Sequence, residues 1–294
     1  MFYKISRIFA LTLFAILIVV PTLVVVFGSF KGDLELMTKP LALPESWSLR
    51  NYRTLLEGGE ILTNFRNSTV VTLFSVVVTL FVASLASFGI ARAINVTGRF
   101  LFVLFSLGLA IPAATSIIGI YELFVRFNLT NTLHGLVIIN VASTLPISIF
   151  ILTAFFRQIP HELYESASID GAKPWRLYRS IALPLSKPSM AAVAIFLFVI
   201  TWNDLLYPLL LITQADLKTL PLALLDFRGE YAINFSMIFT AVMVASVPMV
   251  VMYLSMQKTF VSGLTAGRLK ANEFSDYPYS ASITRTDEAP SGIH

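Results

Sequence analysis

Six long apolar stretches divide the chain, and they constrain its fold more than any other feature. Each has at least the roughly 20 residues that a helix needs to cross a hydrocarbon core about 30 Å thick. A bilayer core offers no water to the backbone, so a spanning segment of this length is expected to be helical. The stretches are residues 8–30, 68–91, 100–121, 135–156, 189–212 and 235–257. The sequence therefore predicts an all-α membrane protein with six transmembrane helices.

Composition supports the same class. Hydrophobic residues make up 56% of the chain and charged residues 13%, where a soluble domain carries about 25% charged residues. Lys4 and Arg7 precede the first stretch as they would in a secretory signal, but the stretch is too long and no small-x-small cleavage site follows it. We expect it to remain as the first transmembrane helix. The absence of cysteine excludes disulfides, thiolate chemistry and cysteine-ligated zinc.

The basic residues indicate a membrane environment and an orientation. The net charge is only +4, and the basic side chains lie scattered at the ends of the apolar stretches, so lipid headgroups and partner proteins are expected as counter-surfaces and nucleic acid is not. With the amino terminus inside, the cytoplasmic segments would be 1–7, 92–99, 157–187 and 258–294. These hold thirteen Lys and Arg, and the other three loops hold eight. This modest bias predicts that both termini are cytoplasmic.

The polar connection between the fourth and fifth stretches predicts a small amphipathic helix-turn-helix. Leu163, Ala167 and Ile169 recur at helical spacing and would form a docked apolar face. Gly171 can end the first helix in a left-handed cap, and Pro174 can open the next. The charged side chains would be offered to a groove in another protein; they are Glu165, Asp170, Lys173, Arg176 and Arg179. The alternative is a solvated loop that contains a helix.

This connection carries a motif at the full spacing of a known signature. The residues are Glu165-Ser166-Ala167, Asp170-Gly171-Ala172, Ile181-Ala182-Leu183-Pro184 and Lys187-Pro188. The motif resembles the "EAA" signature of the membrane subunits of binding-protein-dependent ABC importers. Ser166 stands where the family usually has alanine, which is an exchange of one small residue for another.

The resemblance extends over roughly residues 10–270. The other residues on which it rests are Asn67-Ser68, Asn131-Thr132, Trp202-Asn203-Asp204 with Pro208, and Gly263-Leu264-Thr265-Ala266-Gly267 with Lys270. Together they resemble the maltose-type permeases, which import sugars and related solutes, and in particular the smaller of the two paired membrane subunits. The resemblance implies the type I importer permease fold, with residues 1–270 as a single transmembrane domain.

Partners follow from the same resemblance. It implies a second homologous membrane subunit, two ATP-binding subunits, an extracytoplasmic solute-binding protein, and the cytoplasmic membrane of a bacterium or archaeon. The chain has no Gly-x-x-x-x-Gly-Lys-[Ser/Thr] loop, so ATP and Mg²⁺ are expected on the partner ATPase and no cofactor on this chain. In the motif, Glu165 would anchor the ATPase electrostatically, Gly171 would supply the bend, and Ala167 would fit closely into the cleft. Ser166, Asp170, Ala172 and Pro184 complete this coupling loop.

The external loops offer candidate docking surfaces. Loop 31–66 is the longest, and it is expected to hold an extended run and then a short surface helix around Leu49–Leu56. It would either dock the solute-binding protein or act as a lid that shields the bundle. Loops 122–134 and 213–234 are candidates for the same surface.

Two further sets of residues match the family pattern. The match implies that Trp202, Asn203 and Asp204 line or frame the translocation path, and an ionisable group such as Asp204 is costly inside an apolar stretch, which itself suggests function. A purely structural role is the equal alternative. Gly263, Thr265 and Gly267, in a polar and turn-rich segment, would contact the ATPase. Residues 271–294 are rich in Ser, Thr, Asp, Pro and Gly, and we expect a disordered cytoplasmic tail.

Two other function classes compete with the importer. An ion- or proton-coupled secondary transporter would need ionisable residues near the membrane centre and usually repeated halves, and only Asp204 offers such a group. A membrane-embedded enzyme would need a nucleophile–base pair or a metal cluster. The three histidines, His134, His161 and His294, are isolated from one another, so no catalytic or metal-ligating residue is assigned. The expected solute is a disaccharide, an oligosaccharide or a glycerol-phosphate-like molecule.

Overall fold

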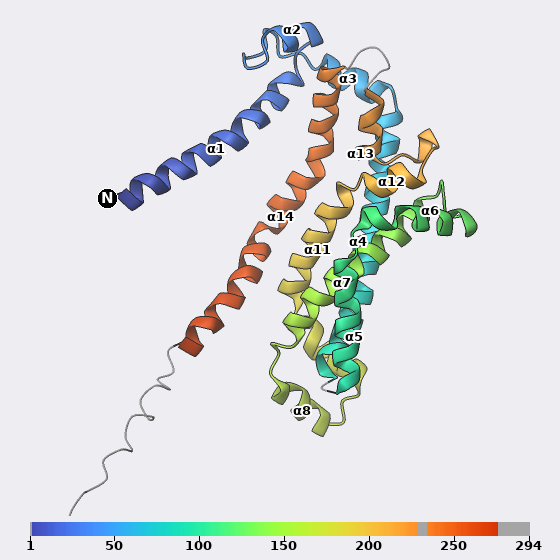
Figure 1. The fold of residues 1–294 in the computed structure, drawn as a ribbon. Coiled ribbons are helices and arrows are strands. Elements are labelled where there is room, and N and C mark those ends of the chain that lie inside the picture. The colour runs from blue at the N-terminus through green and yellow to red at the C-terminus, as the bar shows by residue number, and fades with distance from the viewer. Residues whose placement is uncertain (1, 94, 228–233, 276–294) are drawn as a thin grey trace, which may run out of the picture.

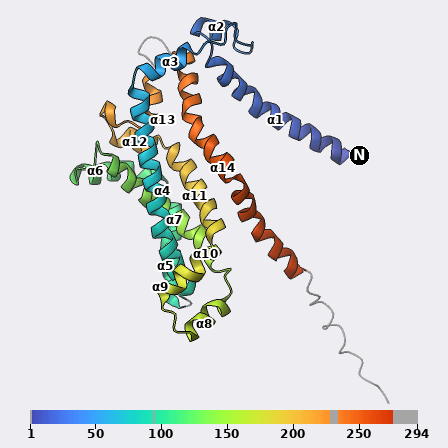
Figure 2. The same ribbon diagram turned by 180° about the vertical axis from the view of Figure 1, so that it is seen from behind.

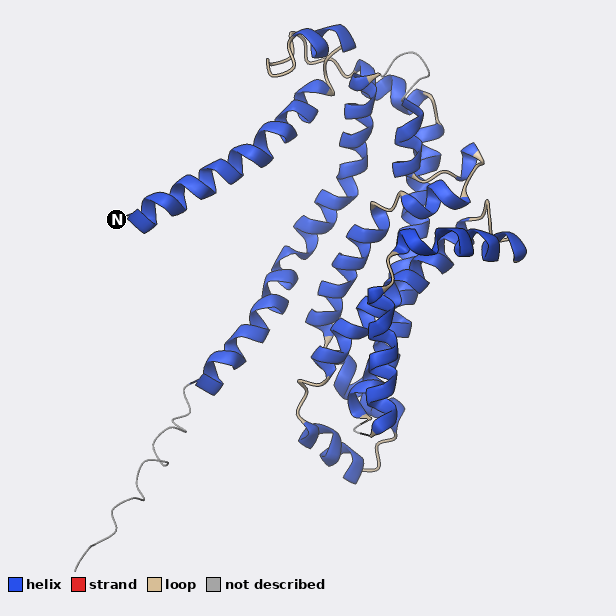
Figure 3. Cartoon of the chain, viewed as in Figure 1, coloured by secondary structure: helices blue, strands red, loops and turns tan. Residues whose placement is uncertain are grey.

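The computed structural model describes residues 2–93, 95–227 and 234–275, and these residues form helices and connecting loops without a strand (Figure 3). The bundle is built from α4 (Glu60–Arg92), α7 (Leu133–Phe156), α11 (Lys187–Trp202) and α14 (Phe235–Ser275). Figure 1 shows α4, α7 and α11 running side by side, with α5 (Val96–Leu107) against the lower part of α7. The largest core cluster lies between these helices and includes Val76, Ile149, Leu197 and Ala241.

The first helix stands apart from this bundle. α1 (Phe2–Gly28) is apolar along its whole length, yet its most hydropathic window is 0% buried. Figures 1 and 2 show it diverging from the bundle, with its last turns near the upper end of α14. The chain then forms α2 (Asp33–Thr38) and α3 (Arg50–Glu57). The predicted surface helix around Leu49–Leu56 is thus confirmed as α3.

Two of the predicted spans are not continuous helices. In the third, α5 and α6 (Ile117–Arg126) are separated by two 3-10 turns, Gly108–Ala110 and Ala113–Ser116, with a bend of 85°. Pro112 lies at this break, where it cannot donate a helical hydrogen bond. In the fifth, α11 ends at Trp202 and α12 (Leu206–Leu211) begins after a short break.

By length and composition, four described helices can cross a membrane: α1, α4, α7 and the first part of α14. The number rises to six if each of two bent helix pairs forms one span. The pairs are Val96–Ala110 with Ala114–Arg126, and Pro174–Leu185 with Lys187–Trp202. The membrane-spanning, all-α class is therefore confirmed, while the count of six remains a prediction.

The last helix differs from expectation at its end. α14 continues to Ser275, so the predicted turn-rich character of residues 263–270 is wrong. The run contains good helix formers such as Leu264, Ala266 and Leu269, and a single glycine costs a helix only about 1 kcal/mol. Residues 271–275 are also helical, and the remainder of the predicted disordered tail, 276–294, lies outside the described residues.

Candidate functional site

The segment that carries the motif folds as an elbow at one end of the bundle, which we call the elbow end. It consists of α8 (His161–Ile169), α9 (Pro174–Leu177), a π-helical turn (Tyr178–Ala182) and α10 (Leu183–Leu185). The second half of the elbow, Pro174–Leu185, meets α11 at an angle of 75°. In Figure 1, α8 projects below the bundle and lies across it. The elbow thus holds two short helices, α8 and α9, joined by a turn at residues 170–173.

Gly171 makes the turn, as predicted. Its φ is +77°, a left-handed conformation that costs L-residues with a side chain roughly 1–2 kcal/mol. The turn is closed by two backbone bonds, Gly171 N–H to Ser168 O at 3.0 Å and Ala172 N–H to Ala167 O at 3.0 Å. Pro174 then opens α9 at its first position. Local sequence therefore determines this geometry.

The docked face of α8 is only in part the predicted one: Ala167 packs against the core, but Leu163 and Ile169 do not lead the contact. Ile169 is 87% exposed and Leu163 is 43% exposed, whereas Tyr164 is only 4% exposed. The ring of Tyr164 lies 6.1 Å from the ring of Phe88 on α4, and the Arg92 guanidinium is 5.3 Å from the same tyrosine ring. A large aromatic side chain that also meets a cation gains more from docking than a leucine does, which explains the change of face.

Two more side chains join this contact, and we call the set of five the aromatic joint: Ser84, Phe88, Arg92, Tyr164 and Tyr178. The Tyr178 hydroxyl is 2.7 Å from Ser84 Oγ, and the Tyr178 ring is 5.4 Å from that of Phe88. Burial raises the pKa of the Tyr164 phenol and the Arg92 charge opposes this shift, so the phenol is protonated at neutral pH. The joint fixes the elbow to α4, which is distant in sequence.

The opposite face of the elbow is open. Glu165, Ser166, Asp170, Gly171 and Pro184 are exposed, while Ala167 and Ala172 are half-buried. A groove of about 430 Å³ runs over this face. It is lined by Leu163, Ser166, Ala167, Asp170, Ser180, Ile181, Pro184 and Leu185. The fold thus brings the two halves of the motif together on one surface, and Glu165 forms no ion pair there within the described residues.

The three residues predicted for the translocation path have different surroundings. Trp202 is buried, and its indole N–H donates to Ala245 O of α14 at 3.0 Å. Asp204 is half-buried, and its Oδ1 accepts from Leu206 N–H at 3.1 Å and Tyr207 N–H at 3.4 Å at the start of α12. Its Oδ2 is buried without a hydrogen-bond partner among the described residues. Asn203 alone of the three is exposed.

The other end of the bundle, the far end, contains three anchoring residues whose contacts were not predicted from the sequence. Asn67 donates its side-chain amide to Asp216 O at 2.8 Å and Lys218 O at 3.0 Å. Ser68 Oγ accepts from Leu220 N–H at 2.7 Å. Asn131 Oδ1 accepts from Thr213 N–H at 2.7 Å and Gln214 N–H at 3.2 Å. The sequence feature that could have pointed to these residues is a polar side chain at or just before the start of an apolar stretch.

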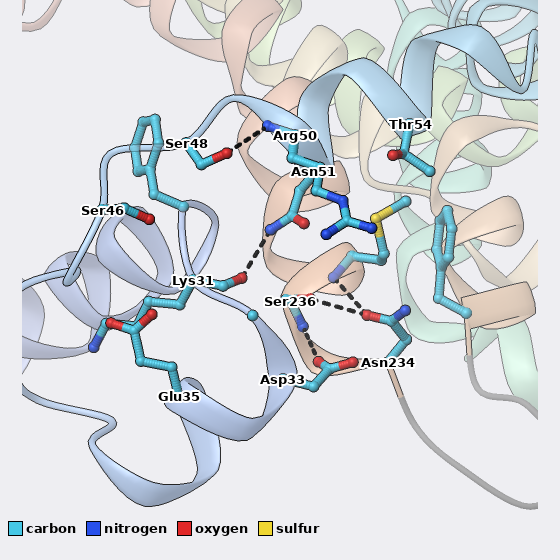
Figure 4. Close-up of a pocket in the computed structure, with 14 residues that line it drawn as sticks. Lys31, Asp33, Glu35, Ser46, Ser48, Arg50, Asn51, Thr54, Asn234 and Ser236 are labelled. Atoms are coloured by element: carbon cyan, nitrogen blue, oxygen red, sulfur yellow. Dashed lines mark hydrogen bonds between the residues drawn. The ribbon is translucent and has the colours of Figure 1, made fainter.

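A polar pocket also opens at the far end, between the loop after α1, α3 and the start of α14 (Figure 4). Its volume is about 590 Å³. Lys31 is 1% exposed, and its ammonium donates to Lys39 O at 2.7 Å and Ala42 O at 2.6 Å. Asp33 accepts from Ser236 N–H at 2.9 Å and so ties the loop to α14. Arg50 also lines this pocket and forms no ion pair within the described residues.

Gly263, Thr265 and Gly267 lie on the helical backbone of α14, in a part of the helix whose side chains are not described. Within the described residues, no group of three or more His, Cys, Asp or Glu side chains is placed to hold a metal ion.

Known structures share this fold. The class that the described residues define is an all-α membrane protein, a bundle of spanning helices with an exposed elbow between two of them. The fold is similar to a chain in the crystal structure of a bacterial ABC transporter involved in the import of alginate, with a TM-score of 0.79 at 17% identity over 88% of this chain and 96% of that one. A chain of the MetNI methionine ABC transporter gives a TM-score of 0.55 over 72% of this chain and 97% of that one, at 14% identity.

Sequence comparison supplies the family. Residues 1–264 match the family described as "Binding-protein-dependent transport system inner membrane component", and the chain belongs to it. It is 32% identical to the diacetylchitobiose uptake system permease protein NgcG of Streptomyces coelicolor, over 88% of this chain and 87% of that protein. It is also 32% identical to the trehalose/maltose transport system permease protein MalG of Thermococcus litoralis, over 91% of this chain and 97% of that protein.

Proposed function

We propose that this chain is one of two membrane permease subunits of an ATP-driven importer for a sugar, either a disaccharide or an oligosaccharide, and that it forms half of the translocation pathway. Relatives named for diacetylchitobiose, trehalose/maltose and arabinooligosaccharides support this class of solute. A glycerol-phosphate-like solute remains within the proposed class.

The observation that carries the proposal is the construction of the elbow. One face is fixed to the bundle by the aromatic joint. The other presents the exposed carboxylate of Glu165, which has no ion pair among the described residues, beside an open groove. Such a surface suits a partner that binds through charge and shape and transmits motion to the bundle. In this mechanism, closure of two ATP-binding subunits tilts the elbow together with the ends of α7 and α11, and the pathway changes from inward-facing to outward-facing.

The same proposal assigns a position on this chain to each membrane or ATP-binding partner. ATP and Mg²⁺ bind to the two ATP-binding subunits, which contact the elbow and the end of α14 near Gly263, Thr265 and Gly267. The elbow end and both termini lie in the cytoplasm of a bacterium or archaeon. A second, homologous membrane subunit completes the pathway, and Asn203 faces it from the break after α11.

The solute-binding protein docks at the far end, where the polar pocket of Figure 4 offers the free guanidinium of Arg50. Interfaces that form and dissociate in each cycle are more polar than permanent ones, and this pocket is polar where the flanks of the spanning helices are apolar. The alternative of a lid over the bundle predicts no contact with the binding protein at Arg50.

Reversal of one charge tests the proposed function. Glu165→Lys should abolish ATP-driven sugar uptake by the complex reconstituted with its partners in vesicles. Membrane insertion should not be lost, because Glu165 has no ion pair to lose within the part of the chain that the structure describes. Glu162→Lys is the matched control, since Glu162 is exposed on the same helix outside the motif, and it should keep most of the uptake.

Two results would contradict the proposal. One is normal uptake by Glu165→Lys. The other is uptake by the wild-type complex that follows an ion gradient and ignores ATP, which would favour a secondary transporter.

A further inference from the structure

The elbow is attached to three helices, and one of them is not its neighbour in sequence. The chain enters the elbow from α7 and leaves it into α11, but the aromatic joint binds it to α4. Phe88 lies at the centre of this joint, within ring-contact distance of Tyr164, Tyr178 and Phe156. A movement of α8 or of the π-helical turn therefore presses directly on α4.

α4 is suited to transmit such a movement over its whole length. It is an unbroken helix of 33 residues, and Figure 1 shows it running from the elbow end to the far end. Buried hydroxyl contacts fix it to α7: Thr79 Oγ1 lies 3.2 Å from Thr144 Oγ1, and Ser87 Oγ donates to Ile149 O at 3.2 Å. By contrast, α11 ends at Trp202 and α12 follows only after a break, so a displacement of α11 is not passed rigidly along its own chain.

The far end of α4 holds a segment that belongs to another part of the sequence. Asn67 and Ser68 bind the backbone of residues 216–220, which follow the broken fifth span. Both anchoring side chains are buried, as is Leu220. The side-chain hydrogen bonds that hold this segment therefore come from α4, and Leu217 also packs in the apolar cluster that contains Tyr207 and Leu211 of α12.

We infer that α4 acts as a rigid rod that couples the elbow to the external segment 216–220. Movement of the elbow reaches α4 through the aromatic joint, and α4 passes it to the segment through Asn67 and Ser68. This inference rests on the proposed function and adds residues to it that lie outside the motif. Helical geometry of about 1.5 Å per residue places the contact at Ser84 about 25 Å from Asn67. The rod makes the external surface respond to nucleotide-driven movement at the elbow.

A double-mutant cycle tests this coupling. Tyr178→Phe removes only the hydroxyl that contacts Ser84, and Asn67→Ala removes only the far-end amide. The measurement is the stimulation of ATP hydrolysis by solute-loaded binding protein, in the full complex reconstituted in lipid. Allosteric couplings commonly reach about 5-fold or more, and each single change should reduce stimulation by about that factor. The double variant should be no worse than the poorer single variant, because both changes interrupt one connection.

The matched control is a second far-end amide. Asn51 donates to Ser29 O at 3.0 Å and Lys31 O at 2.9 Å, so it anchors the loop after α1 and not a segment held by α4. Asn51→Ala combined with Tyr178→Phe should give the product of the two single effects, since distant and unconnected sites add in free energy. Ser68→Ala replaces Asn67→Ala in the cycle if the latter does not assemble.

The outcomes separate the two claims. The coupling through α4 is refuted if the double variant of Tyr178 and Asn67 shows the product of the two single effects, or if neither single change has an effect. Either result leaves the proposed importer function standing. Failure of the wild-type complex to hydrolyse ATP in response to loaded binding protein overturns the proposed function itself.

Discussion

At the scale of single residues, the two carboxylate oxygens of Asp204 have different surroundings, and these point to two different roles, one structural and one in transport. Oδ1 caps the first turn of α12, as an acceptor at a helix start should. Oδ2 is buried and forms no close hydrogen bond within the described residues, with the Asn140 side chain as a polar neighbour of the carboxylate. A buried polar atom without a close partner is costly. The cap favours a structural role, whereas the free oxygen leaves room for a role in the path.

Two substitutions at Asp204 distinguish these roles. Asp204→Asn keeps an oxygen acceptor for the cap but removes the charge, and Asp204→Ala removes both. If the role is structural, the asparagine variant should transport normally and the alanine variant should lose about 1 kcal/mol of stability, seen as a lower thermal midpoint. Loss of uptake in the asparagine variant at unchanged midpoint would show that the charge itself serves transport.

Gly171 gives a second test at this scale. No atom lies within 4 Å of the position that a Cβ would take there, so any effect of substitution comes from the left-handed backbone and not from crowding. Asparagine tolerates this conformation and valine does not. We expect Gly171→Asn to retain ATPase binding and uptake and Gly171→Val to lose both, as measured by co-purification and vesicle assays. Equal activity of the two variants would show that the turn can change without consequence.

At the scale of elements, the connection between α1 and α14 is narrow. α1 meets α14 mainly where Gly28 lies against the ring of Phe239, and a Cβ at Gly28 would collide with that ring and lie 3.1 Å from Leu36 Cδ1. The absence of a side chain at this point lets the two helices approach. The break after Trp202 is the other feature of this scale, since it separates α11 from α12. Asn131 holds the end of α12 by accepting from Thr213 N–H and donating to Leu211 O, and α4 holds residues 216–220 beyond it.

Enlarging Gly28 should weaken the connection between these two helices. Gly28→Ala overpacks the contact, and such changes typically cost about 1–3 kcal/mol. The thermal midpoint of the purified complex should fall, and Phe239→Leu in the same chain should restore part of it by making room. If the second change gives no recovery, the contact at Gly28 is not what joins the helices.

At the scale of the whole molecule, the two ends of the bundle differ and the sides are apolar. The elbow end presents a polar groove, the far end presents a polar pocket, and the long flanks of α1 and α4 expose large apolar side chains. Exposed apolar flanks of this extent require lipid or a neighbouring subunit to cover them. The orientation of the two ends across the membrane then decides which partner meets which surface.

The cysteine-free sequence allows this orientation to be measured directly. Ser46→Cys places a thiol on the far-end loop and Ser166→Cys places one on the elbow, and both positions are exposed. In intact cells, a membrane-impermeant thiol reagent should label the first variant and reach the second only after permeabilisation. Labelling of Ser166→Cys from outside would reverse the orientation and remove the contact with a cytoplasmic ATPase.

The sequence alone determined the features that depend on local chemistry and on length. Apolar stretches predict membrane helices because the backbone must satisfy its hydrogen bonds within each helix, and Gly171 with Pro174 predicts the turn of the elbow because few residues fit those backbone angles. Only the tertiary structure decided that Tyr164 docks in place of Ile169, that Trp202 is buried against α14, and that Asn67 holds residues 216–218. These outcomes depend on contacts between segments far apart in the chain, and a pattern within one segment carries no information about what the opposing segment offers.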